Sequence, residues 1–330
     1  MAQEKIFNDF ELSFECLDTL YIGGGTPSLW GNDGADFLKD FFSKKRILLN
    51  NDGEFTLELN PGAWSHRVVS SWEDFGVNRF SIGIQSLDHR FLPILDRVHK
   101  IEESLETLQY FSKRKLNFSV DFMLGLPFSE ELGRDVLSEL ENVLSYGPSH
   151  ISLYILTTGK GYIHKEKLPK ESWIEDEYLK VSSFLKEKGF LHYEVSNFAL
   201  PGKESLHNLK YWGLDSVAAL GPSGTGFLKR GSNGLRYKWN VNGPTYSKEV
   251  LGKEELLLER VYLNLRTLKG VNPSTLFPSE KIRSEFFTLA EKWNKNGFLE
   301  SFGPEKVSLS TKGYLLLDSL MDDLFIKKIV

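Results

Sequence analysis

The feature that most constrains the fold of this 330-residue chain is a regular alternation between short β-type runs and segments with helical periodicity. The runs are rich in β-branched and aromatic residues, and they start roughly 25–40 residues apart, which is the length of a β-loop-α unit. Between them, apolar residues recur at helical spacing. The alternation predicts an α/β fold with a parallel sheet, open or closed as a barrel, and helices outside it. The five runs are residues 19–22, 55–60, 79–84, 117–123 and 150–155.

Each predicted strand ends in residues that a purely structural strand does not need. In parallel α/β folds, ligands bind where the strands end, so side chains gathered there from different strands form one site. The sequence therefore predicts a polar site at the carboxyl ends of the strands. Its candidates are Gly23, Gly24 and Gly25 after the first run, Glu58 and Asn60 in the second, Gln85 after the third, Asp121 in the fourth and Tyr154 in the fifth.

Three consecutive glycines, Gly23 to Gly25, precede Thr26 and Pro27 in the sequence GGGTP. Glycine permits positive φ and lets the backbone approach a ligand closely, because it has no Cβ. The run is not a Walker loop, since no Gly-Lys-Ser/Thr follows, and it does not match GxGxxG. Two interpretations are open: a tight β-to-α turn without a ligand, and the wall of a binding site. Three glycines in succession favour the second.

Glu58 lies in an otherwise apolar run, where a carboxylate costs free energy unless it is paired or functional. Strand alternation places Thr56, Glu58 and Asn60 on one face. That face is solvated in an open sheet but internal in a barrel. Gln85 and Asp121 raise the same choice on other strands, and together these residues favour a single polar site.

Two segments that contain histidine carry further candidates. Arg97 and His99 lie in LDRVH near a helix boundary, where surface charge is the simpler interpretation. His207 is followed by Tyr211 and Trp212 in HNLKYW. A lone histidine is more often structural than a ligand, but a histidine lined by aromatic rings can also hold a planar macrocycle or a haem iron.

Composition excludes several classes of protein. The net charge of −5 gives no electrostatic basis for binding nucleic acid, and no run of 18 apolar residues could span a membrane. The amino-terminal residues are acidic where a secretion signal is positive and then apolar, so we expect a cytoplasmic protein. A single cysteine, Cys16, excludes an intramolecular disulfide and any metal site built from several cysteines of this chain.

Changes in pattern divide the chain into three predicted parts. Residues 1–190 hold the alternating units and form a barrel-like domain. Residues 191–245 are rich in Gly, Ser, Asn and aromatic residues and are expected to form loops and short strands over the site. Residues 246–330 show helices, a hairpin and a last helix, which resembles a winged-helix domain. Such modules often bind DNA, but no basic stripe supports that role here.

Eight motifs follow one another along the chain: YIGGGTPSL, LELNP, GVNRFSIGIQS, DRVH, DFMLGLP, HISLYILT, HYEVSNFALPG and HNLKYW. In this order they resemble the oxygen-independent coproporphyrinogen III oxidase-like family of radical S-adenosylmethionine proteins. The match covers residues 17–212, and its last motif resembles the haem-chaperone branch rather than the oxidases. The resemblance implies a partial (β/α)6 TIM-like barrel, S-adenosylmethionine bound to a [4Fe-4S] cluster, and a haem-chaperone function linked to porphyrin metabolism.

The resemblance also assigns residues and partners. His207, with Tyr211 and Trp212, belongs to a motif associated with haem, which implies haem or porphyrin and a haem-recipient protein as partners. Two alternatives stay open: a coproporphyrinogen III oxidase that forms protoporphyrinogen by oxidative decarboxylation, and a truncated, non-catalytic haem-binding protein. The residues that would line the adenosylmethionine pocket are Gly24, Gly25, Thr26, Glu58, Gln85, Arg97, Asp121 and Leu156.

The chain departs from the family at the cluster. The family binds its cluster through CxxxCxxC on the loop after the first barrel strand, one helix before the glycine run. Here only Cys16 precedes that run, and residues 2–15 are expected to be the intervening helix. We therefore expect the first barrel strand and its loop to be missing, which leaves an unpaired sheet edge. Three explanations are open: a truncated sequence, a protein that has lost radical chemistry but keeps haem binding, and a strand supplied by a partner.

The cysteine count makes a direct prediction. Anaerobic incubation of this chain with iron and sulfide should not give a stable, stoichiometric [4Fe-4S] cluster, because such a cluster needs several thiolates and the chain has one. Absorbance and electron paramagnetic resonance spectra, together with iron analysis, measure the outcome. A spectroscopically normal cluster at one per chain would contradict the prediction.

Overall fold

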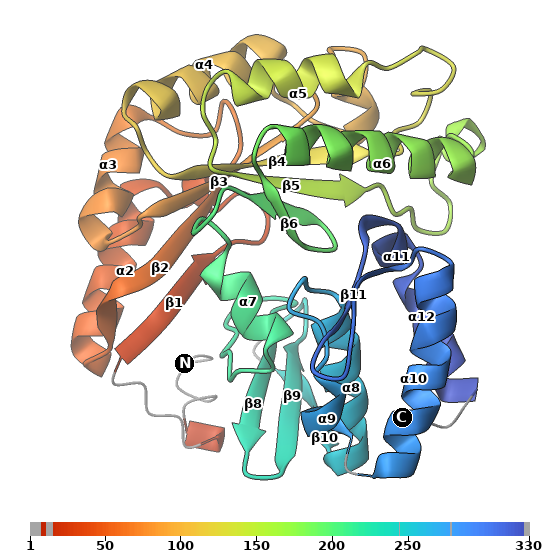
Figure 1. Cartoon of the computed structure of the whole chain (residues 1–330). Helices are drawn as coiled ribbons and strands as arrows, with labels where there is room; N and C mark the ends of the chain where they lie inside the picture. The colour runs from red at the N-terminus through yellow and green to blue at the C-terminus, as the bar shows by residue number, and fades with distance from the viewer. Residues whose placement is uncertain (1–7, 11–15, 244, 278, 327–330) are drawn as a thin grey trace. The chain divides into compact units, whose positions relative to one another are not determined.

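The computed structural model describes residues 8–10, 16–243, 245–277 and 279–326 (Figure 1). Contacts between residues divide the chain into two compact units. The first unit comprises Phe14–His192 with Ser196–Ser205, and the second unit comprises Met1–Ser13, Tyr193–Val195 and Leu206–Val330.

The first unit is built on a mixed, curled sheet of seven described strands in the order β1-β2-β3-β4-β5-β7-β6. Neighbours from β1 to β5 pair in parallel, whereas β7 pairs antiparallel with β5. The parallel strands coincide with the five predicted runs, so the predicted α/β class is confirmed. The strands are β1 (Cys16–Ile22), β2 (Leu48–Leu59), β3 (Arg79–Gln85), β4 (Phe118–Leu124), β5 (His150–Ile155), β6 (Leu191–Glu194) and β7 (Asn197–Ala199).

The helices between these strands begin and end where local chemistry favours it. The α3 helix begins after Ser65, whose hydroxyl accepts a hydrogen bond from Val68 N at 3.3 Å, and it ends at Gly76, which has a φ of 123°. Figure 1 shows α3 to α6 on one side of the sheet. The helices are α2 (Gly31–Lys45), α3 (His66–Phe75), α4 (Ile101–Lys113), α5 (Val136–Leu144) and α6 (Glu171–Glu187), with short 3-10 turns η1 (Pro27–Trp30), η2 (Pro93–Leu95) and η3 (Lys165–Lys167).

The two faces of the sheet differ in chemistry because successive residues of a strand point to opposite sides. Apolar residues of one face are buried against the helices: Leu57, Phe80, Ile82, Val120, Phe122, Ile151 and Leu153. The other face carries polar residues that the strand register places beside one another. One row pairs Glu58 with Ser81, Ser81 with Ser119 and Ser119 with His150, and the next pairs Gly83 with Asp121 and Asp121 with Ser152.

The second unit combines helices with two small antiparallel sheets. Its β10 strand pairs with β9 across the boundary predicted at residue 246, and the later helix, hairpin, helix order agrees with the predicted winged-helix-like arrangement. The elements are α7 (Leu206–Trp212), β8 (Thr225–Arg230), β9 (Asn233–Trp239), β10 (Tyr246–Leu251), α8 (Lys253–Leu265), α9 (Pro273–Leu276), α10 (Glu280–Lys295), β11 (Leu299–Phe302), β12 (Val307–Leu309), α11 (Thr311–Leu315) and α12 (Leu317–Ile326).

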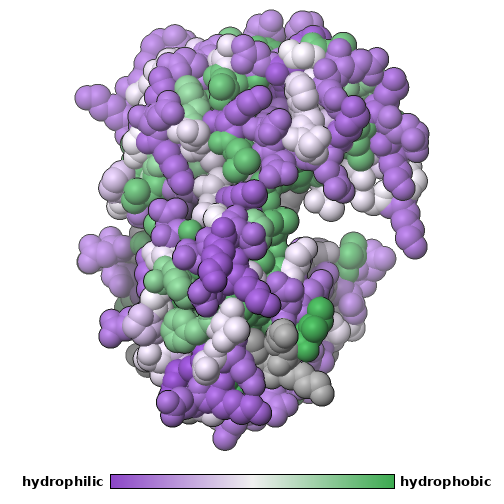
Figure 2. All heavy atoms as spheres, turned by 45° about the vertical axis from the view of Figure 1, so that its right-hand side comes forward, coloured by the Kyte–Doolittle hydropathy of each residue, from purple (hydrophilic) through white to green (hydrophobic). Residues whose placement is uncertain are grey.

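The helix expected over residues 2–15 lies mostly outside the described residues. Within the described part, Phe10 is buried, with its ring centroid 5.3 Å from that of Tyr237 and 5.4 Å from that of Tyr246. Cys16 is the exposed first residue of β1. Hydrophilic side chains predominate on the face shown in Figure 2. No described helix has both the length and the apolar character needed to cross a bilayer.

Two adjacent positions on β2 give a matched stability prediction. Leu57→Ala should lower the free energy of unfolding by about 2–5 kcal/mol, because it opens a cavity at a fully buried site. Thr56→Val should leave it unchanged or raise it by about 1 kcal/mol, since the buried Thr56 hydroxyl has no partner among the described residues. Urea titration measures both. Equal losses of stability for the two variants would contradict the prediction that Leu57, but not the Thr56 hydroxyl, stabilises the fold.

Candidate functional site

The glycine run lies directly after β1, beside β2. A Cβ on Gly23 would lie 2.6 Å from the Tyr21 ring and 2.7 Å from the Glu58 carboxylate, so packing alone requires glycine there. Gly24 and Gly25 each have a φ of 88°, which residues with a side chain rarely adopt. Glu58 joins this loop to the sheet: its Oε2 accepts a hydrogen bond from Gly24 N at 2.9 Å, and its Oε1 accepts one from the Tyr21 hydroxyl at 2.9 Å.

Asn60 connects the glycine loop to the loop after β3. Its Nδ2 donates to Thr26 Oγ1 at 2.8 Å, and its Oδ1 accepts from Arg97 Nη1 at 3.4 Å. Gln85 lies at the same place, because a Cβ on Gly83 would meet Asn60 Oδ1 at 2.6 Å and Gln85 Nε2 at 3.1 Å. The structure therefore brings Thr26, Gln85 and Arg97 together around Asn60, which was predicted for the polar site but not among the residues that line the adenosylmethionine pocket.

Asp121 adds a second carboxylate to this face. Both of its oxygens accept from the Ser81 hydroxyl at 3.2 Å. Burial raises the pKa of Asp121 to about 6, and the nearby Glu58 carboxylate adds to the rise. The pKa of the Tyr21 hydroxyl is also raised, first by burial and then by the charges of Glu58 and Asp121. These shared effects place Tyr21, Glu58 and Asp121 in one electrostatic environment.

The remaining candidates follow β5 in the first unit or lie on α7 of the second unit. Leu156 follows β5, and its backbone N–H donates to Leu124 O at 3.0 Å, so it continues the ladder between β4 and β5. On α7, in the second unit, the ring centroids of His207 and Tyr211 are 5.4 Å apart in an edge-to-face arrangement. The Arg266 guanidinium lies 4.6 Å from the ring centroid of Trp212.

The donor set does not fit an iron–sulfur cluster. Among the described residues, no group of three or more His, Cys, Asp or Glu side chains could hold a metal ion. A four-iron cluster needs thiolates, and the sequence contains one cysteine, Cys16. The polar group around Glu58 and Asn60, by contrast, offers carboxylates, an amide and a guanidinium to a charged organic ligand.

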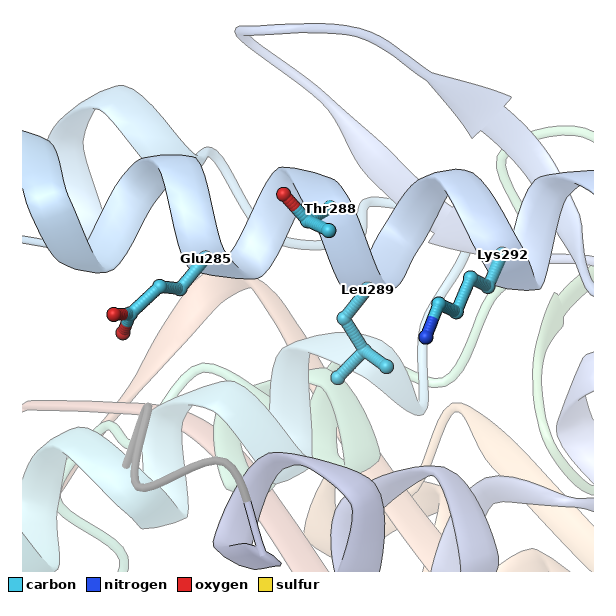
Figure 3. Close-up of a pocket in the computed structure, with 4 residues that line it drawn as sticks. All are labelled: Glu285, Thr288, Leu289 and Lys292. Atoms are coloured by element: carbon cyan, nitrogen blue, oxygen red, sulfur yellow. The ribbon is translucent and has the colours of Figure 1, made fainter.

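A separate pocket lies on α10 of the second unit (Figure 3). It has a volume of about 250 Å³, and Glu285, Thr288, Leu289 and Lys292 line it. None of the sequence-predicted site residues takes part in it.

The chain resembles known proteins in sequence and in structure. The model of the radical SAM superfamily matches residues 2–140. The haem chaperone HemW of Buchnera aphidicola subsp. Schizaphis graminum is 34% identical over 213 residues, which cover 64% of this chain and 56% of that protein. The haem chaperone HemW of Lactococcus lactis subsp. lactis is 32% identical over 285 residues, which cover 80% of this chain and 72% of that protein.

Among solved structures, coproporphyrinogen III oxidase (HemN) from Escherichia coli aligns with a TM-score of 0.78 at 16% identity, over 97% of this chain and 80% of that one. That likeness shows that the chain shares the fold of this structure, in agreement with the curled sheet of the first unit. The 32% identity to the Lactococcus protein, 72% of which the match covers, shows that the chain belongs to the HemW family, and residues 2–140 match the radical SAM superfamily. The chain spans 56% of the length of the Buchnera relative and 72% of the Lactococcus one.

The raised pKa of Asp121 predicts how stability depends on pH. A carboxyl with a pKa of about 6 when folded and 3.8 when unfolded binds its proton more tightly in the folded state, so its contribution falls as pH rises from about 4 to about 6 and is constant above. Asp121→Asn should therefore raise the free energy of unfolding by up to about 3 kcal/mol at pH 8 and little at pH 4. Thermal unfolding of both proteins across this range tests the sign; a difference that shrinks with rising pH would refute it.

Proposed function

We propose that this chain is a haem-chaperone-like protein that binds haem and S-adenosylmethionine and acts in the cytoplasm. The proposal rests on membership of the HemW family, whose relatives in Buchnera and Lactococcus are named haem chaperones. The partners that we propose for it are haem or porphyrin and a protein that receives the haem. Nucleic acid is not among them, since the net charge is −5.

The observation that carries haem binding is the arrangement of α7. His207 and Tyr211 lie on consecutive turns of the helix with their rings in contact, and both are partly exposed. An imidazole can coordinate haem iron, while an adjacent aromatic ring can pack on the macrocycle. Trp212, at the end of the same helix, is proposed as a further aromatic contact, and its ring centroid lies 4.6 Å from the Arg266 guanidinium.

The adenosylmethionine site is proposed at the carboxyl ends of β1 to β4. Arg97 would pair with the ligand carboxylate, and Glu58 or Asp121 with its cationic groups, because opposite charges attract strongly in a partly dehydrated site. Gly24, Gly25 and Thr26 would contact the ligand through their backbone, with Gln85 beside them, and Leu156 is proposed for the opposite wall. When bound to a cluster, S-adenosylmethionine supplies radical chemistry to such proteins. Because this chain lacks a set of cluster ligands, the proposal covers binding and not cleavage.

Haem titration tests the proposal at α7. His207→Ala should weaken haem binding about tenfold or more, because it removes the proposed iron ligand. His89→Ala is the control, since its side chain is 87% exposed and therefore more accessible to free haem than that of His207. Absorbance in the Soret region measures both affinities. An unchanged affinity for His207→Ala, or an equal loss for His89→Ala, would count against His207 as a contact.

A further inference from the structure

The loop after β3 begins with a conformation that needs outside support. Gln85, a buried residue of the proposed adenosylmethionine site, has a φ of 68°. Residues with a Cβ disfavour this left-handed region, so it persists only where the surrounding structure determines it. What holds the loop in this shape therefore also determines where the Gln85 amide lies.

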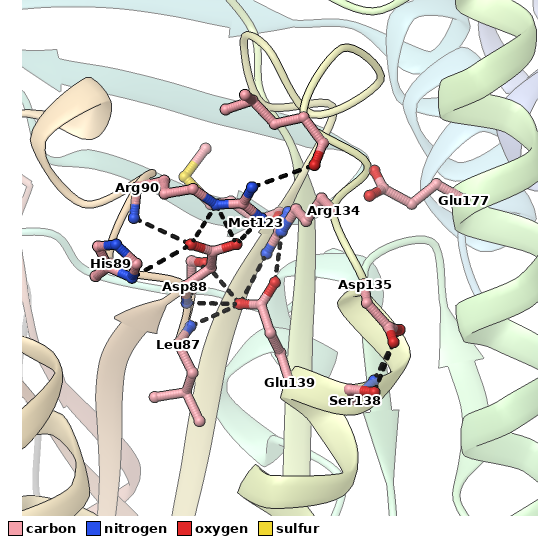
Figure 4. Close-up of polar contacts among 12 residues, drawn as sticks. Leu87, Asp88, His89, Arg90, Met123, Arg134, Asp135, Ser138, Glu139 and Glu177 are labelled. Atoms are coloured by element: carbon pink, nitrogen blue, oxygen red, sulfur yellow. Dashed lines mark hydrogen bonds and ion pairs between the residues drawn. The ribbon is translucent and has the colours of Figure 1, made fainter.

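Glu139, in the first turn of α5, supplies that support (Figure 4). One of its oxygens, Oε2, accepts from Ser86 Oγ at 2.6 Å, from Leu87 N at 2.6 Å and from Asp88 N at 3.2 Å. Three consecutive residues after Gln85 thus donate to one carboxylate. Charged acceptors of this kind make the stronger hydrogen bonds in proteins.

Arg134 fixes the carboxylate in turn. Its Nε donates to Glu139 Oε1 at 2.7 Å, and its Nη1 donates to Met123 O of β4 at 2.6 Å. The guanidinium also lies 5.3 Å from the ring centroid of Phe91 and 5.4 Å from that of Phe122. The Arg134 side chain has no exposed surface, so the pair is dehydrated and rigidly placed.

The same loop leads from Gln85 to Arg97. Within this loop Phe91 and Leu92 are buried, and Arg97 N donates to Leu92 O at 3.0 Å. We propose that the Arg134–Glu139 pair positions Gln85 and Arg97 for binding S-adenosylmethionine; the inference rests on the proposed function. Both residues are positioning residues, because they act through the loop and no contact with the ligand is assigned to them.

A buried ion pair can also be merely structural, and β2 offers a matched control. Glu54 and Arg79 form a second buried pair, with Arg79 Nε 3.8 Å from Glu54 Oε2. Glu54 lies four residues before Glu58, about 13 Å along the strand toward its amino end. Glu54→Gln therefore removes a buried carboxylate of comparable kind away from the loop after β3.

The experiment compares Glu139→Gln with Glu54→Gln in the full chain. Amide hydrogen exchange reports directly on the Leu87 and Asp88 N–H groups, and calorimetric titration with S-adenosylmethionine reports the dissociation constant. We expect Glu139→Gln to speed exchange at these amides. If the loop then keeps its binding conformation about one tenth of the time, the dissociation constant rises about tenfold. Glu54→Gln should change neither quantity. Ser86→Ala removes one hydrogen bond to Glu139 and leaves the ion pair intact, so it serves if Glu139→Gln fails to fold.

Each outcome of this comparison supports or overturns the positioning role of the Arg134–Glu139 pair. Faster exchange at Leu87 and Asp88 with an unchanged dissociation constant would overturn the positioning role. An equal loss of affinity in Glu54→Gln would overturn it as well, because the effect would then be global. If the wild-type chain does not bind S-adenosylmethionine, the proposed function fails together with the positioning role. Binding by the wild type and equally tight binding by Glu139→Gln would remove the positioning role alone.

Discussion

The interaction on which the candidate site depends is the pair of hydrogen bonds that Glu58 accepts from Gly24 N and the Tyr21 hydroxyl. A carboxylate on the inner face of a sheet is stable only if such donors replace its lost water. To donate a hydrogen bond from Gly24 N to Glu58, the chain turns toward β2 directly after β1. This turn needs glycine at position 23 for space, and at positions 24 and 25 because both have positive φ. The same two hydrogen bonds therefore hold the glycine loop of the candidate site and join β1 to β2 at the edge of the described sheet.

The same interaction, a glutamate that accepts a hydrogen bond from a backbone N–H of a loop, recurs along the sheet. Glu58 accepts Gly24 N after β1, Glu139 accepts Leu87 N and Asp88 N after β3, and Glu177 accepts Gly125 N at 2.9 Å after β4. Burial raises the pKa of Glu177, which shows that holding a carboxylate there has a cost. Three loops at the carboxyl ends of parallel strands are thus each anchored by a glutamate that reaches them from a neighbouring element.

The parallel strands could be predicted because their buried residues form short apolar runs bounded by turns. The polar end of the sheet could be predicted because glycines and polar side chains interrupt these runs where the strands end. Sequence reasoning missed Glu139, since a glutamate in the first turn of an amphipathic helix looks like an ordinary surface residue. It missed β10 because four successive residues of that edge strand, from Ser247 to Val250, are exposed, so no alternation marks it. On α2, apolar character alone does not predict burial: Phe37 is 48% exposed, whereas Gly34 and Ala35 are buried.

The charges of the candidate site also link its ligand to its protonation. Asp121 titrates at about pH 6 because burial and the neighbouring Glu58 oppose its negative charge. A cationic ligand, such as the proposed S-adenosylmethionine with its sulfonium and ammonium groups, would favour the ionised carboxylate and so lower the pKa of Asp121. By thermodynamic linkage, that ligand binds more tightly once the pH exceeds about 6. An anionic ligand would show the opposite dependence, because it would favour protonated Asp121, so the sign of the pH effect on affinity distinguishes the two kinds of occupant.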